Sequence, residues 1–124
     1  MTDVAFDRLD QVVLARVSGE IDIACADRLE EAIVAAAWAA NDAGLVVDLS
    51  DVGFLDSAGI RLVFSIHRAL TESGRPMAIV VPDGARIASV LRIVDMPSVV
   101  WTAATVDGAI AMLYPPGVER HSSS

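Results

Sequence analysis

The chain has 124 residues, of which 54% are hydrophobic, and its 17 acidic and nine basic side chains give a formal net charge of −8. This length fits a single domain, and the apolar content is enough for a core, which argues against intrinsic disorder. The negative charge argues against nucleic acid as a partner, because its phosphates would be repelled.

Strand and helix patterns alternate along the chain, which favours a layered α/β domain. In the first half the patterns predict strands at 4–9 and 11–17, a loop at 18–22, a helix at 24–40 and a strand at 45–49. The strand at 11–17 places Val13, Ala15 and Val17 on one face and Val12 and Leu14 on the other. The strand at 45–49 is almost entirely apolar, as expected for a central strand covered on both faces.

The helix at 24–40 is expected to bury the helically spaced residues Leu29, Ile33, Ala36 and Ala40 and to stop at 41–44. The second half predicts a helix at 57–72, a strand at 77–81, a turn at 82–84, a helix carrying Ile87, Val90, Leu91 and Val94, a strand at 98–101, and a helix N-capped by Thr105 that ends at Leu113. We therefore expect one domain at 1–114, followed by a flexible tail at 115–124.

The expected cellular location rests on features that the sequence lacks. A single cysteine, Cys25, rules out an internal disulfide and suits a reducing environment. The first residues are acidic, so we expect no signal peptide, and no apolar stretch approaches the roughly 18 residues of a membrane helix. These features predict a soluble cytoplasmic protein with no membrane partner.

The most informative segment leads from the central strand into the helix at 57–72. Asp56 and Ser57 both fit the N-cap preference, so a plain capping pair is one interpretation. The other is functional, because the strand delivers this loop to the carboxyl edge of the sheet, where α/β folds place their sites. A phosphate on Ser57 would meet unpaired amides at the helix start, a contact worth about 0.3–1 kcal/mol, with Arg61 one turn away.

Such a phosphate would bring about two negative charges close to Asp56 and Asp22. The fold would tolerate this exposed charge. A partner pressed against the same surface would not, because repulsion and desolvation both oppose it. Local chemistry therefore permits a phosphorylation switch at Ser57, alongside the plain capping interpretation.

An enzymatic serine is the rival interpretation. The nucleophile elbow requires Gly-x-Ser-x-Gly, and this chain has Leu55 at the first glycine position. A base is also missing, because His67 lies mid-helix and His121 lies in the predicted tail. One cysteine and two scattered histidines form no metal cluster. We expect no catalytic residues, no metal, no cofactor and no enzymatic activity.

Two surface features remain open. Trp38 falls opposite Leu29 on its helix, so it either anchors a partner or second copy or tucks under a neighbouring loop. A polar stripe on the helix at 57–72 reads by default as its solvated face; it comprises Arg61, Ser65, Arg68 and Glu72.

Two motifs in this order resemble the STAS domain, and in particular the bacterial anti-sigma factor antagonists. The motifs are VSGEID at 17–22 and VVDLSDVGFLDSAG at 46–59, and the resemblance spans about 4–113. It implies a single STAS-type α/β domain with a mixed, mostly parallel sheet of four or five strands and packed helices. A lipid-transport ATPase subunit and a stress-signalling scaffold are alternative roles that STAS domains fill.

The resemblance also implies a mechanism of partner switching in transcription regulation. The unphosphorylated antagonist binds an anti-sigma factor that is also a serine kinase, and thereby frees a sigma factor. Phosphorylation of the serine that matches Ser57 ends the complex, and a phosphatase reverses it. The implied partner-binding residues are Asp22, Asp56, Ala58, Gly59 and Arg61, and the implied free state is a monomer or weak dimer.

This chain departs from the family pattern after the serine. Ala58 stands where many members have a second serine or threonine, which removes an alternative acceptor. Gly59-Ile60-Arg61 replaces a common Gly-Leu-Gly, so Arg61 adds charge and bulk at the docking surface.

Overall fold

The computed structural model describes residues 2–115, which form a five-stranded mixed sheet in the order β1-β2-β3-β4-β5. The first pair of strands is antiparallel and the other three pairs are parallel. The strands are β1 (Thr2–Leu9), β2 (Val12–Ile21), β3 (Gly44–Leu55), β4 (Met77–Val80) and β5 (Trp101–Ala103). The predicted α/β class and mostly parallel sheet are confirmed. The predicted tail at 115–124 lies outside the described residues, apart from Pro115.

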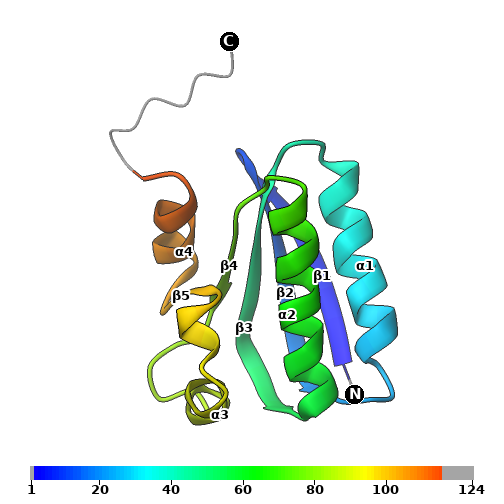
Figure 1. Ribbon diagram of the computed structural model, residues 1–124, viewed down its shortest axis with the longest axis vertical. Coiled ribbons are helices and arrows are strands. Elements are labelled where there is room, and N and C mark those ends of the chain that lie inside the picture. Colours follow the sequence, from blue (N-terminus) through cyan, green and yellow to red (C-terminus); the bar gives the residue numbers. More distant parts are fainter. Residues whose placement is uncertain (1, 116–124) are drawn as a thin grey trace.

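Helices cover both faces of this sheet. They are α1 (Ala26–Ala39), α2 (Ser57–Glu72), α3 (Ala88–Ile93) and α4 (Val106–Leu113), with a short 3₁₀ helix at Met96–Ser98. Figure 1 shows α1 and α2 side by side against the sheet, and α4 packs on β3, β4 and β5. None of the helices described here is long and apolar enough to cross a membrane.

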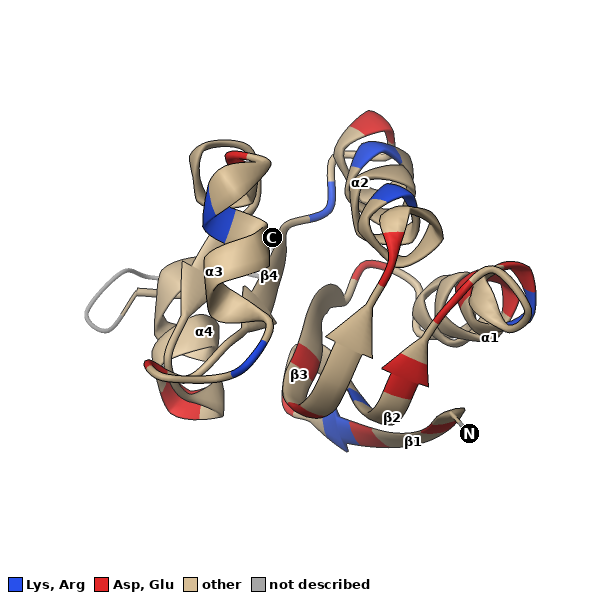
Figure 2. Cartoon of the chain, turned by 90° about the horizontal axis from the view of Figure 1, so that it is seen from below, with Lys and Arg blue, Asp and Glu red and all other residues tan. Residues whose placement is uncertain are grey.

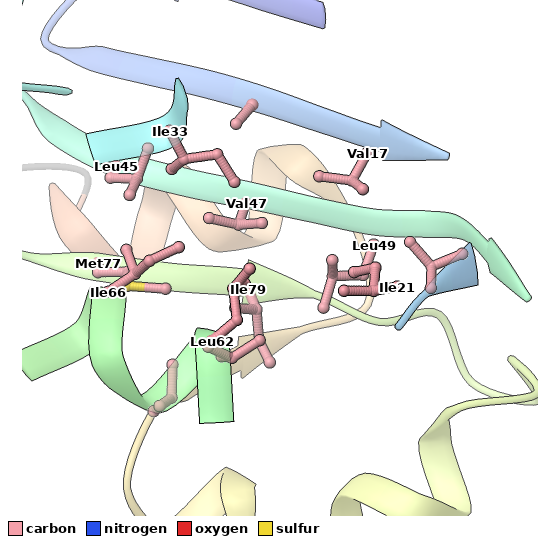
Figure 3. Close-up of a cluster of buried hydrophobic side chains, with 14 of the residues drawn as sticks. Val17, Ile21, Ile33, Leu45, Val47, Leu49, Leu62, Ile66, Met77 and Ile79 are labelled. Atoms are coloured by element: carbon pink, nitrogen blue, oxygen red, sulfur yellow. The ribbon is translucent and has the colours of Figure 1, made fainter. Parts of the chain in front are cut away.

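The main core lies between the sheet and the pair α1 and α2, and Figure 3 shows its centre. As predicted, β2 directs Val13, Ala15 and Val17 into this core and Val12 and Leu14 into a second one under α4. The central strand β3 divides its apolar residues in the same way. The labelled side chains in Figure 3 are Val17, Ile21, Ile33, Leu45, Val47, Leu49, Leu62, Ile66, Met77 and Ile79.

Two strands extend further than the sequence predicted. β2 continues to Ile21 and β3 to Leu55, so the expected loop at 18–22 is mostly strand. Register shifts between Arg16 and Ser18 and between Gly19 and Glu20 interrupt the alternation that identifies a strand. Gly19 has a φ of 95°, a conformation that glycine adopts most readily. The extended strands carry their two following loops to one place.

Smaller differences follow from local packing. The last strand is Trp101–Ala103 instead of 98–101, because Met96–Ser98 form a 3₁₀ helix. In α1 the buried alanines are Ala26 and Ala37, whereas Ala36 and Ala40 are half-buried at the edge of the core. The predicted stop of α1 is confirmed, and Asn41 adopts a left-handed φ of 58° there.

Arg75 joins the end of α1 to the segment between α2 and β4. Its Nε donates to the Ala43 carbonyl at 2.9 Å, and its Nη2 donates to the Ala37 carbonyl. The guanidinium lies 4.8 Å from the centre of the Trp38 ring. Burial lowers the pKa of Arg75, partly offset by the charge of Asp42. Trp38 is 44% exposed and has an intramolecular partner, which favours the second of the two roles considered for it.

Candidate functional site

The candidate site lies at the end of the molecule where β2 and β3 finish and α1 and α2 begin; we call it the Ser57 end. The last residues of the two strands, Ile21 and Leu55, are paired, so the loops that follow them start side by side. Figure 2 looks at this end and shows acidic segments at the end of β2 and on the links into α1 and α2, with basic segments on α2. The predicted residues Asp22, Asp56 and Ser57 all lie here.

Asp56 is the N-cap of α2 and also holds the neighbouring loop. Its Oδ1 accepts hydrogen bonds from the amides of Ala58 and Gly59, at 2.9 and 3.1 Å. Its Oδ2 accepts from the amide of Ile23, at 3.2 Å, in the turn that leads to α1. The amide of Asp56 itself donates to the Ile21 carbonyl at 3.1 Å. One carboxylate therefore joins the starts of both helices.

Ser57 is the first residue of α2 and is exposed. Of the two possible caps, Asp56 has that role, so the fold does not need the Ser57 hydroxyl. Within residues 2–115 no hydrogen bond engages this hydroxyl. The Ser57 oxygen is thus available for chemistry at a position that can change without loss of a cap.

The expected contact between a Ser57 phosphate and free helix amides is wrong in one respect. The amides of Ala58 and Gly59 are already bonded to the Asp56 carboxylate, and the Ile60 amide donates to the Asp56 carbonyl at 3.0 Å. A phosphate would therefore stand next to a carboxylate that occupies the helix start. Arg61, which is exposed one turn along the same helix, is the cation nearest in sequence.

Gly59 is buried where α2 presses against the strand ends. A Cβ atom at this position would lie 2.9 Å from the Leu55 Cβ, 3.0 Å from the Ile21 carbonyl oxygen and 3.1 Å from the Ile21 Cγ2. Ala58, its neighbour, is half-buried and packs on the core. The glycine of the Asp-Ser-x-Gly motif is therefore needed for close packing, and it offers little surface to a partner.

Asp22 shapes the turn between β2 and α1. Its carbonyl accepts from the amides of Cys25 and Ala26, at 3.1 and 2.9 Å. Its Oδ1 accepts from the Ala24 amide at 3.1 Å. Between these fixed points Ile23 projects with 79% of its surface exposed. Ile23 was not among the residues predicted from the sequence. The sequence feature that could have indicated it is an apolar residue within an acidic turn.

A groove of about 570 Å³ separates the first halves of α1 and α2; we call it the α1–α2 groove. Ser65 Oγ donates to Glu30 Oε2 across it, at 2.7 Å. Three members of the predicted polar stripe, Arg61, Ser65 and Arg68, line this groove, so the stripe is a wall of a concave surface. The full lining is Ile23, Ala26, Asp27, Glu30, Ala58, Arg61, Leu62, Phe64, Ser65 and Arg68.

The groups required by the rival enzymatic interpretation are not assembled here. His67 is half-buried on α2, far along the helix from Ser57, with Nε2 3.5 Å from Thr71 Oγ1. His121 lies outside the described residues. Within residues 2–115 no three histidine, cysteine, aspartate or glutamate side chains gather as a metal site.

The bridging role of Asp56 gives a first prediction. Asp56→Ala should lower the free energy of unfolding by about 0.5–2 kcal/mol, and Asp56→Asn should lower it less, because an amide oxygen still accepts as a cap. Urea denaturation measures both. Amide hydrogen exchange should also accelerate at Ile23 in Asp56→Ala, since that amide loses its acceptor.

The matched control is Thr105→Ala, which removes the cap of α4, a hydroxyl that accepts from Gly108 at 3.0 Å. A similar loss of stability is expected there, with no change of exchange at Ile23. Exchange at Ile23 that is equally slow in Asp56→Ala and in the unmodified protein would contradict the bridge.

Comparisons with known proteins agree with this fold. The family model of the STAS domain matches residues 3–109. Among curated proteins, none matches the sequence. An anti-sigma factor antagonist from Mycobacterium paratuberculosis is 27% identical, with a TM-score of 0.79 over 91% of this chain and 94% of that one.

Two further solved structures share the fold. A Thermotoga maritima protein is 21% identical, with a TM-score of 0.78 over 89% of this chain and 93% of that one. The Bacillus cell fate determinant SpoIIAA in its phosphorylated form is 19% identical, with a TM-score of 0.65 over 89% of this chain and 98% of that one. At these identities the likeness establishes the fold alone.

Proposed function

Because this chain belongs to the STAS domain family, we propose that it is an anti-sigma factor antagonist controlled by phosphorylation of Ser57. The unphosphorylated protein binds an anti-sigma factor that is also a serine kinase, and a sigma factor is released. Phosphorylation ends this complex, and a phosphatase restores the binding form. The observation that carries the proposal is the exposed Ser57 hydroxyl, placed beside a cap that the fold needs and free of any structural duty itself.

The comparisons support the role at a coarser level. The Mycobacterium paratuberculosis protein is an anti-sigma factor antagonist and matches almost the full length of this chain. SpoIIAA, which shares the fold, has been solved in a phosphorylated form. Regulation at Ser57 and the identity of a serine kinase as partner are our extension to this chain.

The switch is electrostatic. Asp56 and Asp22 already place carboxylates around Ser57, and a phosphate would add about two further negative charges. Since the Asp56 carboxylate already accepts from the amides of Ala58 and Gly59, these two amides do not neutralise the added charge. A partner that covers Ser57 would have to desolvate the phosphate next to two carboxylates, which opposes binding.

The five predicted partner-binding residues take different parts in this proposal. Asp22 and Asp56 shape the loops that flank Ser57, and Ala58 and Gly59 hold the first turn of α2 close to the sheet. Arg61 either pairs with the phosphate or meets an acidic patch on the partner. The kinase supplies ATP and magnesium, so this chain contributes an acceptor and no catalysis.

The direct test is mass spectrometry after incubation with ATP, magnesium and the histidine-kinase-like ATPase encoded nearest to this chain. We expect one phosphoryl group, mapped to Ser57 and absent from Ser57→Ala. Ser98→Ala, which removes an exposed serine from the 3₁₀ helix, should accept the group as the unmodified protein does.

Other outcomes would redirect the assignment. Stable binding without phosphoryl transfer would favour a constitutive antagonist or a subunit of a lipid-transport ATPase. If the chain neither binds the ATPase nor is modified by it, that result would contradict the proposed function. The family assignment would stay intact.

A further inference from the structure

Ile23 is an exposed apolar side chain on a rigid turn. It is 79% exposed, yet its amide is bonded to Asp56 Oδ2 at 3.2 Å. The next amide, of Ala24, is bonded to Asp22 Oδ1 at 3.1 Å. Both bonds restrict the backbone that carries the side chain. An apolar group held in this way loses little conformational freedom when a partner buries it.

The position of Ile23 links it to both parts of the Ser57 end. It lines the mouth of the α1–α2 groove, together with Ala58 and the half-buried Phe64. Through the Asp56 carboxylate it is also joined to the first turn of α2, where Ser57 lies. A kinase that covers Ser57 from the groove side would therefore contact Ile23.

The charges around Ile23 indicate what kind of surface fits it. Asp22 and Asp56 flank the turn, and Asp27 and Glu30 stand on the α1 side of the groove. Two arginines, Arg61 and Arg68, stand on its α2 side. The turn and the α1 side of the groove are thus acidic, so the complementary surface is an apolar pocket with a basic rim where it faces Asp27 and Glu30.

We propose that Ile23 is the apolar anchor of this protein in its complex with the serine kinase and that it fills an apolar pocket rimmed by lysine or arginine. This inference rests on the proposed function. Anchors of this kind are the positions where truncation weakens binding most. It also gives the switch a second component, because the phosphate would stand at the edge of an apolar contact that must exclude water.

The test compares two isoleucines. Ile23→Ala should raise the Kd for the serine kinase about tenfold or more, measured by isothermal titration calorimetry. Ile93 on α3 is the matched control, because it is the same residue type with 82% exposure. Ile93→Ala should leave the Kd unchanged. Both substitutions remove exposed atoms, so both variants should unfold at the temperature of the unmodified protein.

Phe54 tests the direction from which the partner approaches. It is 52% exposed near the end of β3, beside Leu55, which packs into the main core. Neighbouring residues of a strand point to opposite faces, so Phe54 faces away from the groove. A loss of affinity in Phe54→Ala, with none in Ile23→Ala, would overturn the inference and assign the contact to the other face of the sheet.

Kinase binding by the unmodified protein distinguishes a failure of the proposed function from a failure of the Ile23 anchor alone. Absence of kinase binding by the unmodified chain would contradict the proposed function, and the anchor with it. Normal binding by the unmodified chain and by Ile23→Ala alike would overturn the anchor alone. A basic rim also requires that association slows as salt is raised, so an association rate independent of salt would contradict that rim.

Discussion

Changing Ser57 to aspartate should weaken the complex with the serine kinase about tenfold or more, because a partner that covers Ser57 must desolvate the new carboxylate next to that of Asp56. The added carboxylate would stand beside Asp56, whose own carboxylate already accepts from the amides of Ala58 and Gly59. Ser57→Ala removes only a hydroxyl that the fold does not use, so its affinity should stay close to that of the unmodified protein.

Calorimetric titration of the kinase with each variant measures both effects. Ser98→Asp is the control, since it adds the same charge to an exposed serine in the 3₁₀ helix and should leave the affinity unchanged. Equal affinities for Ser57→Asp and Ser57→Ala would rule out a charge switch. Arg61→Ala belongs in the same series, and unchanged affinity together with an unchanged phosphorylation rate would remove both roles considered for Arg61.

Replacing Gly59 by alanine should lower the free energy of unfolding by about 1–3 kcal/mol, as overpacking of a filled core does. The new Cβ would meet the Leu55 Cβ at 2.9 Å and the Ile21 carbonyl oxygen at 3.0 Å. Neither is the free end of a flexible side chain, so α2 must move away from the strand ends. Urea denaturation should reveal the loss as a lower midpoint.

Gly53→Ala is the matched control for this substitution. A Cβ there has nothing within 4 Å, and Gly53 is exposed on β3. Its stability should stay near that of the unmodified protein or rise slightly, because alanine restricts the unfolded chain more than glycine does. A loss in Gly59→Ala no larger than that in Gly53→Ala would contradict the packing role of Gly59.

Much of the fold could be predicted because its apolar pattern is local. The alternation along 12–17 and the apolar run at 45–49 place β2 and β3 inside a sheet that is covered on both faces. What the pattern could not supply were the strand ends. The register shifts after Arg16 and Gly19 break the two-residue period, so strand residues there carry the composition of a loop.

The residues of the candidate site could be predicted from the sequence, but the role of each residue could be predicted less well. The sequence cannot distinguish Asp56 from Ser57 as the cap, because both side chains satisfy the same preference. Asp56 differs from Ser57 by a second bond, from the Ile23 amide, which lies 33 residues earlier in the chain and is in reach only once β2 and β3 have paired. The amides of Ala58 and Gly59, which a phosphate was expected to use, are bonded to the other oxygen of the same carboxylate.

The order of the strands has a consequence for synthesis of the chain on the ribosome. Every strand pairs with its neighbours in the sequence, from β1 to β5. Each new strand therefore emerges next to a partner that has already been made, and the sheet can grow in one direction. Its second face, with Val46, Ala78 and Val80, stays uncovered until α4, which follows all five strands in the sequence, emerges. The nascent protein thus keeps this apolar surface open until α4 has been synthesised and can pack on β3, β4 and β5.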